Sequence, residues 1–128
     1  MYDRVRARLP GKKTPGPDGV HNEVLKHLPE SFHVALHRLF IQLWALERTP
    51  DSWKRALTIL LYKQDDPHNV ANYRPIGLLN AVYKMWTSVV TMCMTSFVEE
   101  HSVLSGTQEG FRPKRGTLRQ LQRLIMAM

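Results

Sequence analysis

An arginine placed directly before a proline is the first feature of this chain that points to chemistry. In the stretch NYRPIGLLN (72–80), Pro75 fixes its own backbone angle and pushes Arg74 into an extended conformation. The guanidinium of Arg74 therefore leaves a stiff piece of backbone, and its planar fork of N–H donors suits an anion. The alternative is a surface arginine near the end of an edge strand, where a proline is tolerated.

A second cation lies at the end of the preceding apolar run. This run, ALTILLYK (56–63), is rich in strand-forming residues and ends at Lys63. The polar residues QDDPHNVA separate it from NYRPI, so the sequence predicts an antiparallel hairpin. A hairpin brings Lys63 and Arg74 onto one face only in a suitable register, which the sequence does not determine.

Two pairs of residues have the types, but not the context, of metal ligands. His33 and His37 have i, i+4 spacing, yet they fall on the polar side of a predicted helix without a third ligand. Asp65 and Asp66 follow Tyr62, as paired aspartates do in the metal-binding turn of polymerases, but two residues separate Tyr62 from Asp65 where that turn has one. We interpret the histidines as solvated and the aspartates as acids at a loop tip, and we predict no metal site.

Length and composition indicate one domain's worth of chain. The 128 residues are 43% hydrophobic, which is enough for a core, and the single Cys93 excludes an internal disulfide. No apolar stretch approaches the roughly 20 residues that cross a bilayer, and the first ten residues lack the apolar block of a signal peptide. We expect an intracellular protein, in the cytoplasm or the nucleus, with no membrane partner.

The net charge of +7 is concentrated at the two ends of the chain. Residues 1–13 hold five basic residues and Asp3, and residues 104–128 hold five basic residues and Glu109, so each end carries +4 and the remainder −1. Clustered Lys and Arg are typical of a protein with a phosphate-rich partner such as RNA, although a basic end is often only a solvated face.

The elements that must position these residues are mostly helices. Apolar spacing predicts helices over residues 2–9, 20–28, 31–48, 80–98 and 117–128, with Asp18, Ser31 and Asn80 as caps of the second, third and fourth. The stripe of the third comprises Phe32, Ala35, Leu36, Leu39, Phe40, Leu43 and Trp44. Together with the hairpin, these helices predict a mostly helical α+β fold.

The last predicted helix has an apolar stripe that runs to the final residue. The stripe comprises Leu118, Leu121, Leu124, Ile125 and Met128. A domain seldom ends inside such a stripe, because the apolar face would have nothing to pack against. We therefore expect an incomplete domain.

Three blocks of the sequence together resemble a known enzyme family. The blocks KKTPGPDGVHNEVLKHLP, PDSWKRALTILLYKQDDPHNVANYRPIGLLNAVYKMW and LSGTQEGFRPKRGTLRQL are similar, in this order, to the first blocks of reverse transcriptases of the non-LTR retrotransposon and group II intron type. The resemblance implies that residues 1–128 are a partial reverse transcriptase domain, namely the fingers and the start of the palm of a right-hand polymerase.

The resemblance also assigns roles to individual residues. It implies that Lys63 and Arg74 contact the triphosphate of the incoming nucleotide. It further implies template contacts by four residues of the third block: Gln108, Arg112, Lys114 and Arg115. Glu109 departs from the family pattern, in which an apolar or aromatic residue is commoner at this position.

The activity implied by the resemblance is RNA-directed DNA synthesis. Its partners would be an RNA template, a DNA primer, deoxynucleotide triphosphates and the remaining palm and thumb, and its cofactor would be Mg²⁺. Family members carry three catalytic aspartates after the last block seen here, so we expect no catalytic residue in this chain and no activity of the chain alone. The alternatives are a non-enzymatic, basic helical RNA-binding module and an inactive retroelement relic.

Overall fold

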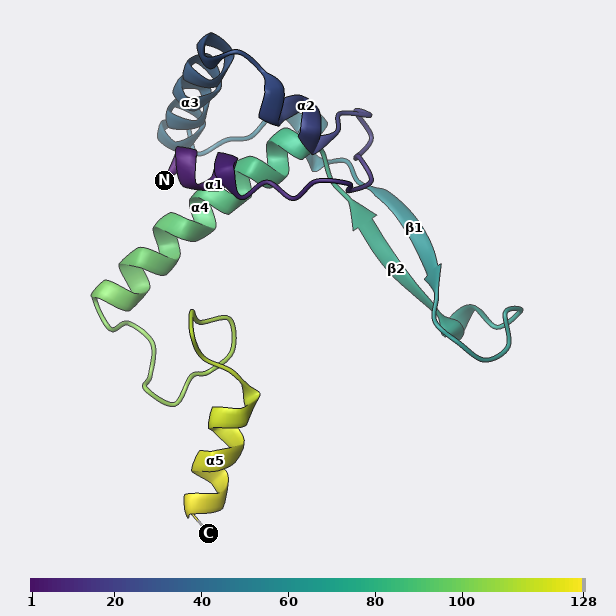
Figure 1. Cartoon of the computed structure of the whole chain (residues 1–128), viewed down its shortest axis with the longest axis vertical. Helices are drawn as coiled ribbons and strands as arrows, with labels where there is room; N and C mark the ends of the chain where they lie inside the picture. Colours follow the sequence, from purple (N-terminus) through teal and green to yellow (C-terminus); the bar gives the residue numbers. More distant parts are fainter. Residues whose placement is uncertain (128) are drawn as a thin grey trace. The chain divides into compact units, whose positions relative to one another are not determined.

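The computed structural model describes residues 1–127 as helices joined to one small antiparallel sheet (Figure 1). The elements are α1 (Tyr2–Ala7), α2 (Asn22–His27), α3 (Glu30–Ala45), η1 (Asp51–Lys54), β1 (Leu57–Tyr62), η2 (Val70–Asn72), β2 (Tyr73–Leu78), α4 (Ala81–Glu100) and α5 (Thr117–Ala127). This mixture agrees with the predicted α+β class. Met128, the last residue of the predicted stripe, lies outside the described residues. The chain divides into two compact units, Met1–Val89 and Val90–Met128.

The core of the first unit lies where α1, α3 and the first turns of α4 meet. The ring centroids of Tyr2 and Phe40 are 5.7 Å apart, and those of Phe40 and Trp86 are 5.3 Å apart. The buried apolar residues of the unit are Tyr2, Val5, Leu9, Leu25, Leu36, Phe40, Leu43, Trp53, Leu78, Ala81, Met85 and Trp86.

The buried face of α3 differs from the predicted stripe. Its buried residues are His33, Leu36, Phe40 and Leu43, whereas Phe32, Leu39 and Trp44 of the predicted stripe are 42%, 37% and 57% exposed. The prediction that His33 is solvated is wrong, because α1 packs over this residue. His33 is only 1% exposed. Its Nδ1 shares a hydrogen bond of 2.8 Å with the Tyr2 hydroxyl. His37 is exposed, as predicted, and stacks on the Tyr2 ring.

Two of the predicted helix caps are absent. Helix α3 begins one residue before Ser31, after Pro29, and no side chain caps it. Helix α2 begins at Asn22, too far along the chain for Asp18, whose Oδ1 instead accepts a hydrogen bond from the Val20 backbone N–H. Asp18 therefore shapes the turn before the helix, because an aspartate side chain commonly accepts a hydrogen bond from the backbone N–H two residues later.

The loop between α1 and α2 packs tightly against the start of α4. A Cβ atom on Gly16 would lie 2.4 Å from the carbonyl carbon of Leu79 and 2.6 Å from the backbone nitrogen of Asn80. Asn80 directly precedes α4, as predicted, but its side-chain amide donates to the Ser52 carbonyl at 3.4 Å. Gly16 is therefore required by space, since any side chain would meet backbone.

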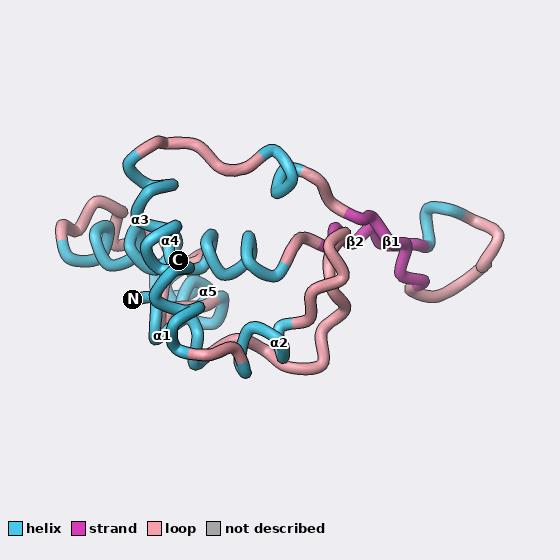
Figure 2. The backbone as a smooth tube through the Cα atoms, turned by 90° about the horizontal axis from the view of Figure 1, so that it is seen from above, coloured by secondary structure: helices cyan, strands magenta, loops and turns pink. Residues whose placement is uncertain are grey.

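Strands β1 and β2 form the predicted hairpin. They pair antiparallel from Leu57 opposite Leu78 to Tyr62 opposite Tyr73. Every residue of β1 is exposed, and both views show the hairpin extending away from the helices of its unit (Figure 1, Figure 2). The hairpin thus presents both faces to solvent along most of its length, while Leu78 at its base is buried.

The second unit has few buried side chains. Phe97 of α4 is 57% exposed and stacks on His101, with ring centroids 4.2 Å apart. The α5 residues Leu118, Leu121 and Leu124 are 53–78% exposed. Within residues 1–127, no helix is both long enough and apolar enough to cross a membrane.

Candidate functional site

The register of the hairpin places Lys63 and Arg74 on one face. Arg74 lies directly opposite Leu61, and the backbone N–H of Lys63 donates to the Asn72 carbonyl at 2.9 Å, so the pairing continues one residue past β1. Directly opposite residues share a face, and so do residues two apart along a strand. Lys63 and Arg74 are therefore diagonal neighbours, with a separation of roughly 7–8 Å typical of such positions.

Both cations are available for a ligand. The Lys63 and Arg74 side chains are exposed, and neither has a hydrogen bond or an ion pair with any residue that the structure describes. The same face continues toward the base of the hairpin with apolar residues, Ile59 and Ile76 among them, each less than two-fifths exposed. The charge is thus confined to the tip end of an otherwise apolar face.

Two tyrosines on the opposite face stabilise the tip. The rings of Tyr62 and Tyr73 lie directly across the strands, with centroids 5.4 Å apart. The Tyr73 hydroxyl donates to the Pro67 carbonyl at 2.9 Å, and the Tyr62 hydroxyl donates to the Asp65 carbonyl. These contacts tie the loop to the strands and hold the ends that carry the two cations.

The two acids of this loop lie at its tip, as predicted. Asp65 and Asp66 are exposed, and Oδ1 of Asp66 accepts from the His68 backbone N–H at 2.9 Å. Among residues 1–127, no three His, Cys, Asp or Glu side chains are placed so that they could hold a metal ion.

The third sequence block lies in the second unit, where Arg112 is engaged within the fold. Its guanidinium donates two hydrogen bonds of 2.7 Å to the two carboxylate oxygens of Glu99 and one of 3.0 Å to the Ser105 carbonyl. The Arg112 side chain is 7% exposed. This bidentate pair joins the loop to the end of α4, and the hydrogen bond from Arg112 holds the pKa of the Glu99 carboxyl below its ordinary value.

Glu109 is buried among three arginines. Its side chain is 5% exposed, and Oε1 lies 3.5 Å from Arg115, 3.6 Å from Arg119 and 2.8 Å from Arg123. The directed hydrogen bonds of Arg115 and Arg123 go to the Gly106 carbonyl instead, at 3.0 and 2.7 Å. A template contact is predicted for Arg115 but not for Arg119 or Arg123, although the i, i+4, i+8 spacing of the three arginines was a usable signal.

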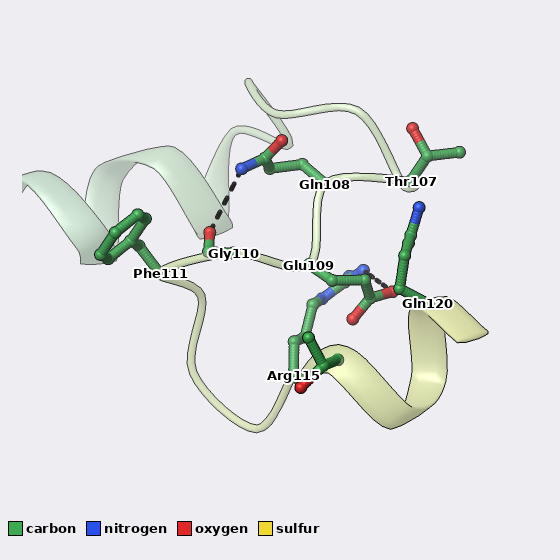
Figure 3. Close-up of a pocket in the computed structure, with 9 residues that line it drawn as sticks. Thr107, Gln108, Glu109, Gly110, Phe111, Arg115 and Gln120 are labelled. Atoms are coloured by element: carbon green, nitrogen blue, oxygen red, sulfur yellow. Dashed lines mark hydrogen bonds and ion pairs between the residues drawn. The ribbon is translucent and has the colours of Figure 1, made fainter. Parts of the chain in front are cut away.

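An open pocket of about 370 Å³ adjoins this cluster. Figure 3 shows Gln108 at its edge, where its side chain donates to the Gly110 carbonyl at 3.3 Å, and Arg115 beside Glu109. Lys114 is exposed and has a positive φ of 59°. The structure thus gathers Gln108 and Arg115 at one pocket, while the Arg112 guanidinium is bound to Glu99.

The known proteins that are similar to this chain carry similar names. No protein-family model matches the chain. The chain is 32% identical to "Probable RNA-directed DNA polymerase from transposon BS" of Drosophila melanogaster over 91% of its own length and 13% of that protein. It is 30% identical to "Probable RNA-directed DNA polymerase from transposon X-element" of Drosophila melanogaster over 94% of its length, and 30% identical to "RNA-directed DNA polymerase from mobile element jockey" of the same species over 93%.

The chain matches only a short segment of each of these relatives. The chain spans only 13% of the length of each of these three relatives, and nearly all of its own residues are included. The chain is therefore homologous to a segment of the RNA-directed DNA polymerases of non-LTR transposons.

Proposed function

We propose that this chain is the fingers and the start of the palm of an RNA-directed DNA polymerase, and that its hairpin binds the triphosphate of the incoming nucleotide. The observation that carries this proposal is the hairpin register, which puts two exposed cations on one face, and neither side chain has a hydrogen bond or ion pair within residues 1–127. The names of the homologues support the activity, and the free cation pair supports the assignment of the residues.

The two cations suit different parts of the task. The Arg74 guanidinium offers parallel N–H donors that bind two phosphate oxygens at once, and Pro75 restricts the backbone from which it extends. Lys63 supplies a compact charge with three donors that rotate freely. Charges fixed before the reaction stabilise the negative charge that develops on the departing pyrophosphate without reorganisation during the step.

The metal chemistry belongs to other residues. The complete polymerase would need residues other than those described here to hold Mg²⁺, which would supply positive charge near the primer hydroxyl and the phosphates. The described residues do not fit that role, because no three of their His, Cys, Asp or Glu side chains are placed to hold a metal ion and the adjacent Asp65 and Asp66 are exposed in a loop. The part of Lys63 and Arg74 is to bind and orient the nucleotide relative to an RNA template and a DNA primer held by the whole enzyme.

The test is substitution of Arg74 in a complete polymerase that carries this segment. We expect Arg74→Ala to lower the catalytic efficiency for the nucleotide by about 100-fold, as loss of one preorganised donor commonly does, and to leave template affinity unchanged. Arg74→Lys recovers part of the loss, because the ammonium keeps the charge but not the fork.

The matched control is Arg55→Ala. Arg55 is an exposed arginine two residues before β1, at the other end of the hairpin. Its loss removes the same charge from a position beside the base of the hairpin and should leave nucleotide efficiency within about twofold, as expected of a surface substitution. An Arg74→Ala enzyme with normal nucleotide efficiency at saturating template and primer would contradict the proposal.

A further inference from the structure

Strand β1 has an outer edge with no neighbouring strand. Among residues 1–127 the sheet contains only β1 and β2, so each strand has one edge that pairs with nothing in the sheet. The hydrogen bond from the Lys63 N–H to the Asn72 carbonyl makes these two residues a hydrogen-bonded pair. Alternate residues back from Lys63 therefore bond to β2, and the residues between them direct both backbone groups outward. The outward-directed residues of β1 are Thr58, Leu60 and Tyr62.

The two outer edges differ in what protects them from another strand. The outward-directed residues of β2 are Tyr73, Pro75 and Gly77, and Pro75 has no N–H to donate. Strand β1 contains no proline and no charged residue, and every one of its residues is exposed. Proline and charge are devices by which natural sheets prevent pairing with another chain. The outer edge of β1 is therefore the one that can accept a further strand.

The sequence of β1 is complementary to itself in an antiparallel arrangement. Because outward-directed residues must face one another, a two-fold axis through Leu60 sets Leu60 opposite Leu60 of a second copy. Thr58 then lies opposite the second copy's Tyr62, and all the outward-directed N–H and C=O groups are paired, which gives about six hydrogen bonds. Ile59 lies opposite the second copy's Leu61, at the positions where side chains come closest.

The same register separates like charges and brings unlike charges together. Lys63 lies opposite Leu57 of the second copy, so the two lysines are at opposite ends of the paired strands. A parallel arrangement would place the two lysines side by side, which is unfavourable. Beyond the strands, the antiparallel register directs the exposed Asp65 and Asp66 of each copy toward the end of the other copy at which the exposed Arg55 lies. Charge therefore favours the antiparallel pair.

The direction of the hairpin leaves room for a second copy. Both views show β1 and β2 extending away from the helices of the first unit (Figure 1, Figure 2). In the antiparallel pair, the first-unit helices of the two copies lie at opposite ends of the shared sheet. Six residues at about 3.4 Å per residue give a shared edge of roughly 20 Å. An interface of this size is small, so we expect a dimer that dissociates on dilution.

We infer that two copies of this chain associate through β1 to form a four-stranded antiparallel sheet, with the strands in the order β2, β1, β1, β2. A second copy is favoured over an unrelated strand, because the edge is complementary to itself in hydrogen bonding, side-chain pairing and charge. The inference goes beyond the proposed function, because Arg74 lies on β2 and outside the shared edge.

Sedimentation of the full chain over a series of concentrations measures the association. We expect a monomer–dimer equilibrium that Leu60→Lys weakens about tenfold, because two ammonium groups then face each other at the two-fold axis. Leu60 is 59% exposed in the monomer, so a lysine there can reach solvent. Leu60→Pro removes the central N–H of the shared edge from each copy and leaves the hydrogen bonds between β1 and β2 intact. This variant should weaken the dimer about tenfold or more.

The matched control is Gly77→Lys. Gly77 lies on β2 directly opposite Thr58, so this variant places the same charge on the same face of the hairpin but not at the shared edge. A Cβ atom on Gly77 meets nothing within 4 Å, so the strand has room for the new side chain. The dissociation constant of Gly77→Lys should equal that of the parent chain. A parent chain that is monomeric at every concentration, or equal dissociation constants for Leu60→Lys and Gly77→Lys, would overturn the inference.

Disulfide cross-linking tests the register. In a Cys93→Ala background, oxidised glutathione should link Leu60→Cys to a second copy of itself, because hydrogen-bonded pairs have a Cα separation of about 5.5 Å, within the range of a disulfide. Thr58→Cys alone should link poorly, whereas a mixture of Thr58→Cys and Tyr62→Cys should link well. Equal linking of Leu60→Cys and Gly77→Cys, or association without this pattern, would rule out the pairing of β1 with β1. No nucleotide is present in these measurements, so their outcome is independent of the nucleotide assignment.

Discussion

At the scale of single residues, the bidentate pair between Arg112 and Glu99 makes the second unit sensitive to acid. Arg112 lowers the pKa of the Glu99 carboxyl from its ordinary 4.5, so the folded state binds a proton at Glu99 less readily than the unfolded chain. The stabilisation is complete above the ordinary pKa and is lost as the pH falls through the lowered one.

We therefore expect the unit to lose stability below about pH 4.5 in part through this pair. Amide hydrogen exchange of the 99–112 segment, followed from neutral pH into this acid range, measures the effect. In Glu99→Gln, exchange should be faster at neutral pH and should change less on acidification. Glu100→Gln, a change in the exposed neighbouring residue, serves as the control and should behave like the parent chain. Identical acid profiles for Glu99→Gln and the parent would show that the pair does not stabilise the fold.

At the scale of elements, Gly16 joins the first loop to the start of α4. A methyl group there would overlap the backbone between Leu79 and Asn80, which cannot move without disturbing β2 and α4. We expect Gly16→Ala to lower the free energy of unfolding by about 1–3 kcal/mol, the usual cost of overpacking.

Gly77 in β2 provides the comparison for this substitution. Nothing lies within 4 Å of a Cβ atom built on Gly77, and Gly77 is not among the residues with positive φ. Gly77→Ala should therefore leave stability unchanged or raise it by about 0.4–1 kcal/mol, because alanine restricts the unfolded chain. Urea denaturation of both variants measures the difference, and equal midpoints would refute the assigned close approach.

The elements also show how far the sequence could predict this fold. Strand propensity and turn residues predicted both strands of the hairpin to within two residues at each end, because both signals are local. The register of the hairpin depends on how two segments align, so the sequence does not determine it. Whether Lys63 and Arg74 share a face depends on this register. Periodicity likewise located α3 but not its buried side, since the hydrogen bond between Tyr2 and His33 made a histidine part of the core.

The candidate site residues divide in the same way: some could be recognised from their neighbours in the sequence, and others are brought together only by the fold. The cations of the hairpin were identified from residue type and from the neighbouring proline. The ion pairs of Glu109 were not, because the path of the loop that brings Glu109 beneath α5 cannot be read from composition. For the same reason the engagement of Arg112 with Glu99, 13 positions earlier, was not foreseen.

At the scale of the whole molecule, the apolar residues of α5 are a liability in solution. Leu118 is 78% exposed and Ile125 is 72% exposed, and both belong to the stripe that predicted the helix. Exposed apolar stripes promote association of partly folded chains.

We expect the double substitution Leu118→Gln and Ile125→Gln to lower binding of a hydrophobic dye and to reduce light scattering at equal concentration, without loss of helical circular dichroism. Leu36→Gln at a buried position of α3 should do the opposite, because it disrupts the core. Unchanged dye binding in the double variant would show that the exposed apolar residues of α5 are not the surface that binds the dye.

The tyrosine pair at the hairpin tip has a consequence for insertions and deletions. Tyr62 and Tyr73 close the hairpin beneath the loop of residues 64–71, so that loop can change length while the strands keep their frame. One residue inserted into β1 itself would either bulge out or turn every side chain on one side of the insertion to the opposite face. We therefore expect insertions to be tolerated better among residues 64–71 than in the strands, where an inserted residue that did not bulge out would place Lys63 and Arg74 on opposite faces.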